Sequence, residues 1–344
     1  MQIGIHHTNG SFSDRWIDYC EAHKIPYKIV DCYKTDIIQQ LADCDALMWH
    51  FNHQSSKDVL FAKQLLYSVK ASGKMVFPDF ETVWHFDDKV GQKYLLEAID
   101  APLVPSFVFY TKEKALEWSD HTDFPKVFKL RGGAGSANVR LARTKSEAIK
   151  LIHKAFGRGF SPYEGWSNLE ERIRKYKLGK TTLFDVFKGI IRLFYTTEFA
   201  RIAGRERGYV YFQDFIPKNS FDIRVIVLDG KAFAIKRMVR ENDFRASGSG
   251  FIKYEKENFT DETVRLSFDI AEKLKSKCLA LDFVYFKNVP LIVEISYGFV
   301  KEVYYPCVGY WDHDLTWHEG EFNSQGWMVE MILDNIKIQE IGKI

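Results

Sequence analysis

The chain has 344 residues, 46% of them hydrophobic and 27% charged, and its formal net charge is +2. This length indicates two or three lobes rather than one compact core, the composition is ordinary for a soluble globular protein, and the small charge gives no argument for nucleic-acid binding. The five cysteines are scattered without CxxC pairing, which argues against a disulfide framework and a zinc site and is typical of a reducing cytoplasm.

The first 88 residues alternate short strands with helices. The N-terminus MQIGIHHTNG resembles a first strand rather than a signal sequence, and the chain contains no run of about 18 apolar residues of the kind that spans a bilayer. The predicted strands are Ile3–His6, Tyr27–Val30, Ala46–Trp49 and Met75–Phe77, and the predicted helices are Asp14–His23 and Lys57–Ala71. This alternation predicts a small parallel α/β lobe.

Ligands bind beyond the carboxyl ends of parallel strands, so the side chains at these ends are candidate substrate contacts. They are His6, His7, Trp49 and His50. A packing or capping role is the alternative for each of them. The two histidines that precede Ser11 and Ser13 also suggest an anion-receiving turn before a helix.

A glycine-rich segment follows the next predicted strand, in the stretch FPKVFKLRGGAGSANV from 124 to 139. Lys129 ends the strand, and Gly132, Gly133, Gly135 and Ser136 follow it. Such a loop can bring backbone N–H groups over phosphates while the lysine supplies charge. It lacks the Lys-Ser/Thr ending of a P-loop and the spacing of a GxGxxG turn, and an ordinary hairpin loop is the alternative.

The stretch from 157 to 208 is basic, with eleven Lys and Arg against six Asp and Glu. Within it, apolar residues recur at the spacing of an amphipathic helix: Leu183, Phe184, Phe187, Ile190, Ile191, Phe194 and Tyr195. One interpretation is a helix that packs on the protein's own lobe. The other is that residues 180–195, with Lys180, Lys188 and Arg192, meet an anionic membrane surface or hold a lipid-linked or acidic substrate.

Asp229-Gly230 is a two-residue turn signal between two predicted strands, 222–228 and 231–240. The turn predicts a register in which Asp222 pairs with Arg237 and Arg224 pairs with Ile235. Asp222, Arg224 and Arg237 then share one face. Two arginines on a sheet face indicate an anionic ligand, and a structural pair between Asp222 and Arg237 is the alternative.

A predicted helix from Glu262 to Ser276 leads into two apolar segments, Leu279 to Phe286 and Leu291 to Ser296. The period of two places Leu291, Val293 and Ile295 on the core face of the second strand. On the opposite face Asp282 lies across from Glu294, with Ser296 nearby. Facing carboxylates are stable with a cation between them, and Mg²⁺ is the expected ion, whereas two exposed acids on a solvated hairpin are the alternative.

The C-terminal tail from Tyr304 to Trp327 is rich in aromatic residues, His and Gly. We expect it to form a loop that closes the substrate side, followed by a helix near Gln325 to Asn335. His313 and His318 are candidate acids or bases in this loop, and exposed or packing histidines are the alternative.

The order of these segments resembles the ATP-grasp superfamily of carboxylate-amine ligases, over most of residues 75 to 300. The resemblance is carried by Asp88-Lys89, Lys129 with its glycine-rich loop, YVYFQDFIP (209–217), the stretch 221–250, and LDFVYF with VEIS. It is greatest to the branch of the ribosomal-protein glutamate ligases. The resemblance implies α/β architecture with α+β lobes: an N-terminal parallel α/β pre-ATP-grasp domain at 1–88, a lid at 89–212 that contains the insertion 157–208, and a C-terminal ATP-grasp subdomain at 213–344.

The resemblance also implies roles for single residues. Lys89 and Lys129 resemble the two lysines that contact the ATP phosphates. Gln213, Asp214, Phe215 and Ile216 resemble the linker that meets adenine, with Asp214 near the adenine or ribose. Asp282 and Glu294 resemble magnesium ligands, and Ser296 stands where the family most often has Asn, which affects the expected metal stoichiometry.

Three arginines complete the implied site. Arg237, beside Asp222 of the nucleotide site, resembles the arginine that steadies the transferred phosphoryl group, and Arg224 and Arg245 resemble substrate-side cations. The implied reaction is ATP-dependent joining of a carboxylate to an amine through an acyl phosphate, which needs positioning and electrostatic stabilisation but no nucleophilic side chain.

The expected partners are a small or sugar-linked carboxylate and an amine such as an amino acid. Similarity to ligases encoded for surface-polysaccharide assembly suggests amino-acid decoration of a sugar acid or amino sugar. A kinase on the same nucleotide site and a non-catalytic nucleotide-binding regulatory module are the alternatives. The sequence does not define the oligomeric state.

Overall fold

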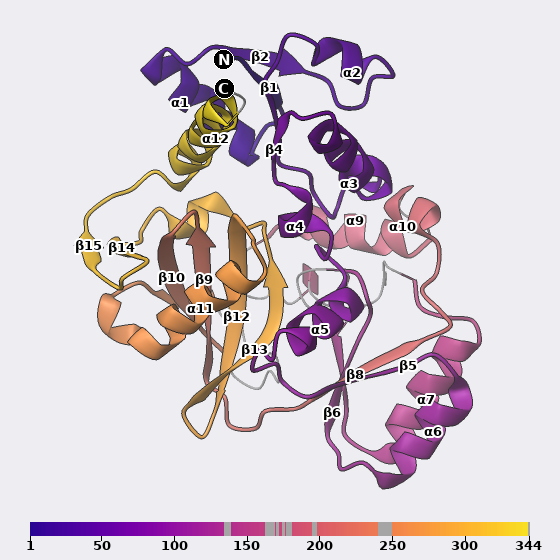
Figure 1. Ribbon diagram of the computed structural model, residues 1–344. Helices are drawn as coiled ribbons and strands as arrows, with labels where there is room; N and C mark the ends of the chain where they lie inside the picture. Colours follow the sequence, from indigo (N-terminus) through magenta and orange to yellow (C-terminus); the bar gives the residue numbers. More distant parts are fainter. Residues whose placement is uncertain are drawn as a thin grey trace.

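The structure is a computed structural model that describes residues 1–133, 139–161, 169, 172–173, 176, 181–194, 198–239 and 250–342 (Figure 1). In these residues three β-sheets form separate layers, each with its own helices. Of the residues singled out above, Gly135, Ser136, Lys180, Tyr195 and Arg245 lie outside the described residues, as do the side chains of Arg192 and Phe194.

The N-terminal sheet is parallel, with the strand order β2-β1-β3-β4. Its strands are β1 (Ile3–His6), β2 (Tyr27–Val30), β3 (Ala46–Trp49) and β4 (Met75–Phe77), and its helices are α1 (Phe12–His23), α2 (Ile37–Gln40), α3 (Ser56–Ala71) and α4 (Phe80–Val83). All four strands have the predicted bounds. The Ser11 and Ser55 hydroxyls accept N–H bonds at the starts of α1 and α3, which explains why both helices begin earlier than the apolar pattern alone indicates.

The second sheet is antiparallel, with the order β5-β8-β6-β7. Its strands are β5 (Ser106–Phe109), β6 (Lys126–Lys129), β7 (Val139–Ala142) and β8 (Val210–Asp214). Helices α6 (Lys112–His121) and α7 (Lys145–Phe156) share a core with it, which contains Phe128, Ile152 and Phe212. Helix α5 (Lys89–Ala98) precedes this lobe, and α9 (Leu183–Phe194) and α10 (Glu198–Ala203) lie between its helix α7 and its strand β8.

The third sheet runs β13-β12-β9-β10-β14-β15, with β11 paired to β10. Its strands are β9 (Phe221–Leu228), β10 (Lys231–Met238), β11 (Ile252–Lys253), β12 (Cys278–Phe286), β13 (Val289–Ser296), β14 (Gly309–Asp312) and β15 (Trp317–Glu319). Helix α11 (Asp261–Lys273) covers one face, where Phe268 packs with Leu281 and Phe283. Two short 3₁₀ turns, η1 (Lys256–Asn258) before α11 and η2 (Lys301–Tyr304) before β14, belong to this lobe. Helix α12 (Ser324–Ile341) follows β15.

The predicted register of the first hairpin is confirmed. Asp222 pairs with Arg237, Arg224 pairs with Ile235, and Leu228 pairs with Lys231. Asp229 and Gly230 form the turn, both at positive φ (46° and 77°), as a two-residue hairpin turn of this class requires.

The second hairpin confirms the pairing of Asp282 with Glu294, which depends on an irregularity in the register. The turn consists of Lys287 and Asn288, so regular pairing would place Asp282 opposite residue 293. A one-residue irregularity between Asp282 and Phe283 brings Glu294 into place. The predicted core face of the second strand was therefore wrong at Leu291 and Val293: Ile292 and Ile295 are the core residues of β13.

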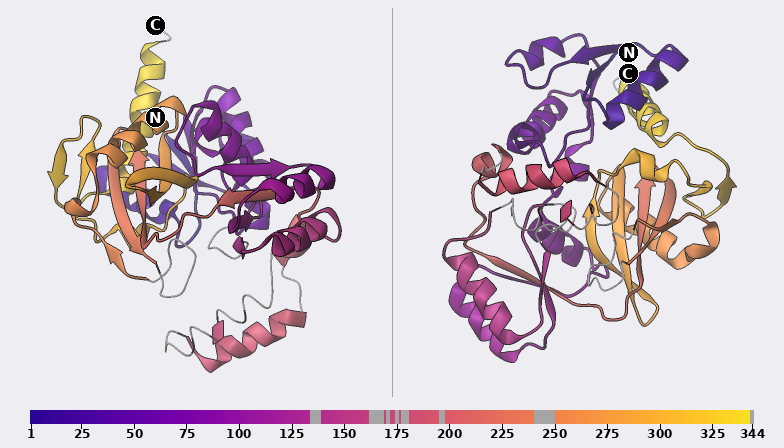
Figure 2. Two further views of the ribbon diagram at one scale, coloured as in Figure 1. Left: turned by 90° about the horizontal axis from the view of Figure 1, so that it is seen from below. Right: turned by 180° about the vertical axis from the view of Figure 1, so that it is seen from behind.

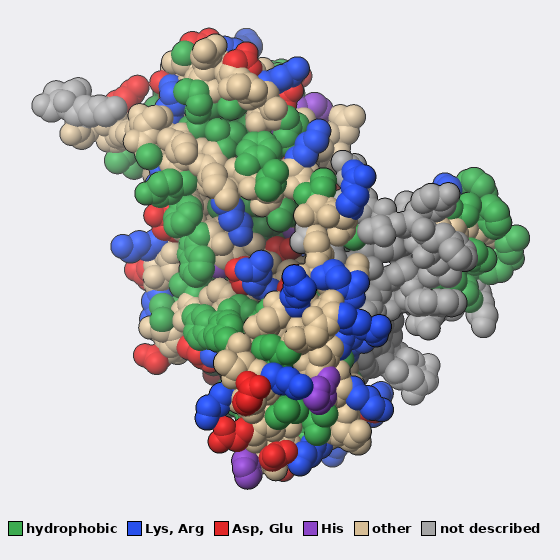
Figure 3. All heavy atoms as spheres, turned by 90° about the vertical axis from the view of Figure 1, so that its right-hand side faces the viewer, with side chains coloured by type: hydrophobic (Ala, Val, Ile, Leu, Met, Phe, Trp, Pro, Cys, Tyr) green, Lys and Arg blue, Asp and Glu red, His purple; other side chains and the backbone are tan. Residues whose placement is uncertain are grey.

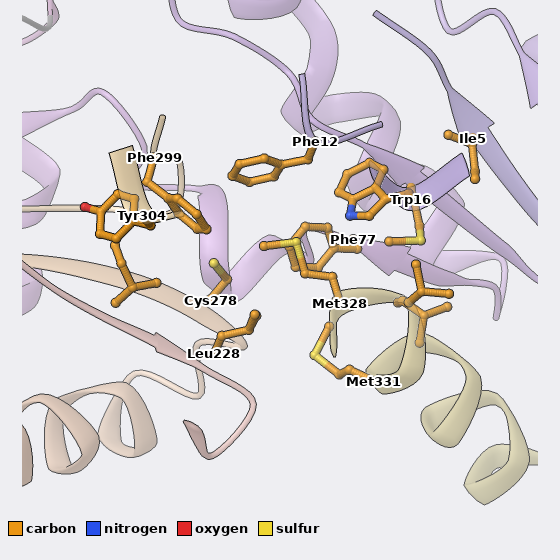
Figure 4. Packing of buried hydrophobic residues seen from close by; sticks show 14 of the residues in the cluster. Ile5, Phe12, Trp16, Phe77, Leu228, Cys278, Phe299, Tyr304, Met328 and Met331 are labelled. Atoms are coloured by element: carbon orange, nitrogen blue, oxygen red, sulfur yellow. The ribbon is translucent and has the colours of Figure 1, made fainter. Parts of the chain in front are cut away.

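The other face of the third sheet packs against the N-terminal lobe through α12. Figure 4 shows Met328 and Met331 of α12 between Phe77 of β4 and Leu228 of β9, with Trp16 of α1 nearby. All of these side chains are buried in one hydrophobic cluster. The C-terminal helix therefore joins the first lobe to the last.

The predicted role of the tail was wrong. Residues 309–319 do not close a substrate site but extend the edge of the third sheet as β14 and β15. None of the residues from Tyr304 to Trp327 lines the cavity described below. No helix within the described ranges has the length and apolarity needed to cross a membrane.

Candidate active site

A cavity of about 580 Å³ lies where the three sheets meet. The N-terminal lobe contributes Phe12 and residues 50–54, the second sheet contributes Lys129 and residues 213–216, and the third contributes the charged face of β9, β10, β12 and β13. Most residues predicted for catalysis, nucleotide and metal binding therefore line one space. They are Lys89, Lys129, Gly133, Gln213, Asp214, Phe215, Ile216, Asp222, Arg224, Arg237, Asp282, Glu294 and Ser296.

The arginines and aspartates of the third sheet form one hydrogen-bonded cluster. Arg224 donates to both oxygens of Asp282, Nε to Oδ1 at 2.5 Å and Nη2 to Oδ2 at 2.6 Å. Arg237 makes the same two-fold contact with Asp222, at 2.8 and 2.5 Å, and its Nη2 also donates to Asp282 at 2.9 Å. The predicted cross-strand pair between Asp222 and Arg237 is thus present, and Arg224 has Asp282 as its partner.

The cluster shifts the pKa values of Asp282 and Asp222 in opposite directions. Burial by itself would raise the pKa of Asp282, but Arg224 and Arg237 outweigh it and lower that pKa to about 2. For Asp222 burial dominates over Arg237 and raises the pKa to about 6. Asp282 is therefore ionised at neutral pH. Its carboxylate could bind another cation in place of an arginine.

Glu294 has a cation of its own, because Lys89 Nζ lies 3.2 Å from Glu294 Oε1. Burial would lower the pKa of Lys89, but Glu294 and Asp87 reverse this and raise it. Lys89 is almost completely enclosed and donates a further hydrogen bond to the carbonyl of Gly133 at 2.9 Å. Lys89 thus contacts both Glu294 of β13 and Gly133 of the glycine-rich loop.

Lys129 is buried, and no carboxylate of the described residues is in hydrogen-bond contact with it. Its Nζ donates to Gln213 Oε1 at 2.7 Å and to the carbonyl of Val293 at 3.5 Å. Gln213 in turn donates to Ser106 Oγ at 3.0 Å. Burial lowers the pKa of Lys129 to about 8, so this ammonium group would gain from an anion in the cavity.

The glycine-rich loop begins with backbone donors that bind carboxylates. The N–H groups of Arg131 and Gly132 donate to Glu206 at 3.2 Å, and Gly133 N–H donates to Asp87 Oδ1 at 2.8 Å. Gly133 adopts φ 104°, which a side chain would strain. These donors form the anion-binding arrangement expected of such a loop, with protein carboxylates as its partners.

The predicted adenine linker borders the cavity from 213 to 216. The side chain of Gln213 positions Lys129, as shown above. Asp214 Oδ1 binds Lys126 Nζ at 2.5 Å, and Phe215 and Ile216 supply apolar lining. A planar apolar ring between the second and third sheets matches the chemistry of this wall.

The predicted magnesium ligands Asp282, Glu294 and Ser296 all line the cavity. Among the described residues no three His, Cys, Asp or Glu side chains cluster as metal ligands. Asp282 and Glu294 face each other in register, which suits Mg²⁺ held by two carboxylates and substrate phosphates. Ser296 Oγ donates to the carbonyl of Gly298 at 3.2 Å and accepts from the N–H of Gly298 at 3.1 Å. In this structure its hydrogen bonds therefore stabilise the turn that follows β13. The two carboxylates fit the ion provided that Arg224 and Lys89 transfer to other anions.

Of the four residues predicted at the strand ends of the first lobe, His50 lines the cavity. His6 is buried and its Nδ1 accepts from Cys32 N–H, and Trp49 is a core residue. His7 contacts Ser13 and Asn9. For these three the alternative of packing or capping is correct.

Two further histidines are also outside the cavity. His318 stacks on Tyr310 and pairs with Asp312, and His313 contacts the ring of Phe268. Neither is placed to serve as an acid or base there.

The structure adds residues that sequence reasoning missed. Asp87, His53 and Lys301 line the cavity, and Glu206 binds its glycine-rich loop. Asp87 carried a weak signal because it stands next to Asp88-Lys89. The other three are brought in by contacts between distant segments, for which the sequence holds no local pattern.

The comparisons with known proteins agree with this architecture. Residues 201–301 match the RimK-like ATP-grasp domain. No curated protein matches the chain.

Solved structures match nearly the whole chain. A RimK domain ATP-grasp protein from Sphaerobacter thermophilus DSM 20745 has a TM-score of 0.55 at 14% identity, with 97% of this chain and 100% of that chain covered. D-alanine–D-alanine ligase from Bacillus anthracis has a TM-score of 0.55 at 14% identity, with 99% of both chains covered, and D-cycloserine synthetase DcsG has 0.58 at 12%, with 98% and 100% covered. Another structure of the Bacillus anthracis ligase is a complex with ATP.

Proposed function

We propose that this chain, which has the ATP-grasp fold, is an ATP-dependent ligase that joins a carboxylate to an amine through an acyl phosphate. The observation that carries the proposal is the convergence of Lys89, Lys129, Arg224 and Arg237 with the facing Asp282 and Glu294 around one cavity. Phosphoryl transfer requires mainly positioning and charge stabilisation, and these are the properties that this set of side chains supplies.

The triphosphate of ATP would lie between the second and third sheets. Among the described residues no carboxylate is hydrogen-bonded to Lys129, so phosphate oxygens would stabilise its charged form. Lys89 would move from Glu294 or Gly133 to a phosphate oxygen. The adenine would lie against Phe215 and Ile216, with Asp214 at its edge.

Magnesium bound with the nucleotide would neutralise phosphate charge between Asp282 and Glu294. Asp282 must then release Arg224, whose planar guanidinium suits a carboxylate or phosphate equally well. Arg224 would turn to the substrate carboxylate, while Arg237, held by Asp222, stays in place. The two arginines would thus have different roles. Arg224 would change its partner from Asp282 to the substrate, and Arg237 would stabilise the transferred phosphoryl group from a fixed position.

The substrate carboxylate would enter on the side of the N-terminal lobe, where His50 is a neutral donor. Burial, and then the charge of Lys301, lower the pKa of His50 to about 3. Its Nδ1 accepts from the N–H of Phe12 at 3.1 Å, so the ring proton is on Nε2, close to Gly298 of the cavity wall. A neutral N–H donor holds a substrate oxygen without competing with Arg224 for the charge.

The sequence resemblance to ligases of surface-polysaccharide assembly supports a finer proposal, in which the enzyme adds an amino acid to a sugar acid or amino sugar in the cytoplasm. The rival with an observation of its own is a non-catalytic nucleotide-binding module. It is favoured by Ser296, which stands where the family most often has Asn and whose hydroxyl is already bonded to the carbonyl and the N–H of Gly298, with one acceptor position left.

The proposal is tested by ADP release from Mg²⁺ and ATP with pooled sugar acids and amino acids, with products identified by mass spectrometry. Glu294→Gln is the site variant, and Glu321→Gln, an exposed acid in the tail, is the matched control. An amide product that is lost with Glu294→Gln and kept with Glu321→Gln supports the ligase. A stable phosphorylated product shows a kinase instead, and ATP binding without turnover on any pool shows the regulatory module.

A further inference from the structure

Helix α9 presents its apolar side to solvent. Leu183, Phe184, Phe187, Ile190 and Ile191 have exposed fractions between 43% and 65%. An amphipathic helix of a globular protein normally buries this side and exposes its polar one. The alternative that α9 packs its apolar side on the protein's own lobe is therefore wrong for these residues.

The other side of α9 contacts residues of the same stretch, 157–208. Gly189 is buried there, and a Cβ placed on it would lie 2.8 Å from Arg172 Cδ and 3.0 Å from Leu169 Cδ1. Arg172 Nη1 also donates to the backbone carbonyl of Asp185 at 2.9 Å. These contacts hold α9 from the side opposite to its exposed apolar residues.

Hydrogen bonds at its first turn stabilise α9 without any contact at its exposed apolar side. The Asp185 carboxylate accepts hydrogen bonds from the hydroxyls of Thr181 and Thr182, each at 2.8 Å, and from Thr182 N–H. These bonds lower the pKa of Asp185 to about 2. A carboxylate at the first turn also favours the helix dipole. An exposed apolar side on a preformed helix calls for a binding partner.

The position and charge of α9 indicate what that partner is. Figure 2 shows α9 projecting from the body of the molecule, and Figure 3 shows hydrophobic side chains gathered at the end of this projection. Lys188 is exposed, and its Nζ lies 4.5 Å from the centroid of the Phe184 ring, at the border of the apolar side. The stretch 157–208 carries eleven Lys and Arg against six Asp and Glu, in a chain whose net charge is only +2.

We propose that α9 docks this protein on an anionic membrane surface. Aromatic and aliphatic side chains on one side of a helix, with lysine and arginine at its border, are the features of helices that lie in a lipid interface. Twelve residues give a helix about 18 Å long, which would lie flat with its apolar side among the acyl chains. A second copy of the chain is a weaker match, because apposing two α9 helices would also appose two basic segments.

The chain continues from α9 through α10 to Glu206, whose carboxylate binds the N–H groups of Arg131 and Gly132. The segment that follows the proposed membrane contact in sequence therefore also contacts the glycine-rich loop.

The test is flotation of the full-length protein with vesicles of phosphatidylcholine alone or with about one third phosphatidylglycerol. The variant is Leu183→Gln with Phe187→Gln. The matched control is Leu60→Gln with Phe286→Gln, which removes one leucine and one phenylalanine with exposed fractions of 67% and 43% from other surfaces. ATP binding and thermal melting are measured in parallel, because both should be the same in all three proteins.

We expect the wild type and the control to float with the anionic vesicles, and the α9 variant to bind at least about tenfold less. Binding should weaken as salt is raised and should be poor on phosphatidylcholine alone. The proposal is overturned by absence of wild-type flotation, by equal losses in both double variants, or by equal binding to both kinds of vesicle. It is also overturned if the wild type instead self-associates in a way that the α9 variant abolishes. Each of these outcomes leaves the ligase proposal standing, because none depends on nucleotide turnover.

Discussion

Lys129 is the residue whose charge depends most on what fills the cavity. The two oxygens that its Nζ contacts, on Gln213 and Val293, are neutral, and burial lowers its pKa to about 8. Triphosphate would supply the missing negative charge and raise that pKa toward the ordinary lysine value. Burial of this lysine would thus be offset by ATP in the cavity.

This predicts a pH dependence of nucleotide binding. Since the free protein loses the Lys129 proton as pH rises through about 8, ATP binding must restore it, and affinity should fall by up to about tenfold between pH 7 and pH 9. Titration calorimetry in two buffers of different ionisation enthalpy should show proton uptake near pH 8.5. Lys129→Arg, which stays charged, should abolish this uptake. Equal uptake in both proteins would assign the proton to another group.

Individual contacts were predictable to different extents. The Asp222 to Arg237 pair could be predicted because the Asp229-Gly230 turn sets the register of the strands that carry it. The Arg224 to Asp282 pair could not, because it depends on β9 pairing with β12, which is distant in sequence. The hydrogen bonds from the glycine-rich loop to Glu206 and Asp87 could not be predicted either, because they too join residues that are distant in sequence.

At the scale of the element, two hairpins hold most of the charged site, and their turns decide which side chains face the cavity. In the first hairpin, Gly230 adopts φ 77° in open space, so a side chain there meets backbone strain alone. In the second, the irregularity opposite Asp282 adds one residue and restores the facing carboxylates. A slip of one residue in either strand pair would turn these side chains into the core.

Gly230→Ala should therefore destabilise the protein by about 1–2 kcal/mol without changing its fold. Asp229→Gly is the matched control, because it removes a side chain from the neighbouring left-handed position (φ 46°) and should be neutral or stabilising. Urea unfolding followed by tryptophan fluorescence measures both. Equal destabilisation by the two changes would contradict the assigned turn.

The strand bounds of the first lobe and the turn of the first hairpin followed from local patterns. The irregularity in β13 did not, because it satisfies a packing requirement between sheets: its Val293 carbonyl reaches Lys129 and Gln213 of the second sheet. The predicted loop at 304–327 failed for a similar reason, since its aromatic residues pack at the edge of the third sheet as Trp311 and Trp317 do.

At the scale of the whole molecule, one hydrophobic cluster joins the first and last segments of the chain. Side chains of β1 and α1, of the third sheet and of α12 all belong to it. It holds the N-terminal lobe, which carries His50, against the sheet that carries Asp282 and Glu294. Which lobes touch was not predictable, because α12 shows no local signal for its partners.

Met328→Ala should thus cost about 2–5 kcal/mol, because Met328 is completely buried in this cluster. Ile338→Ala, on the same helix but 66% exposed, should change stability by no more than about 0.5 kcal/mol. Thermal unfolding of the two variants provides the comparison. A small effect of Met328→Ala would show that α12 does not hold the lobes together.

The central claim is that the cavity activates a carboxylate as an acyl phosphate, and hydroxylamine trapping tests it most directly. Purified protein is incubated with Mg²⁺, ATP, hydroxylamine and pooled sugar acids and amino acids, and hydroxamate, amide and ADP are measured together, with Glu294→Gln and Glu321→Gln in parallel. The account predicts that hydroxamate and amide together equal the ADP formed, and that all three are abolished by Glu294→Gln and unchanged by Glu321→Gln. ADP formed without hydroxamate, or hydroxamate that persists in Glu294→Gln, would contradict it.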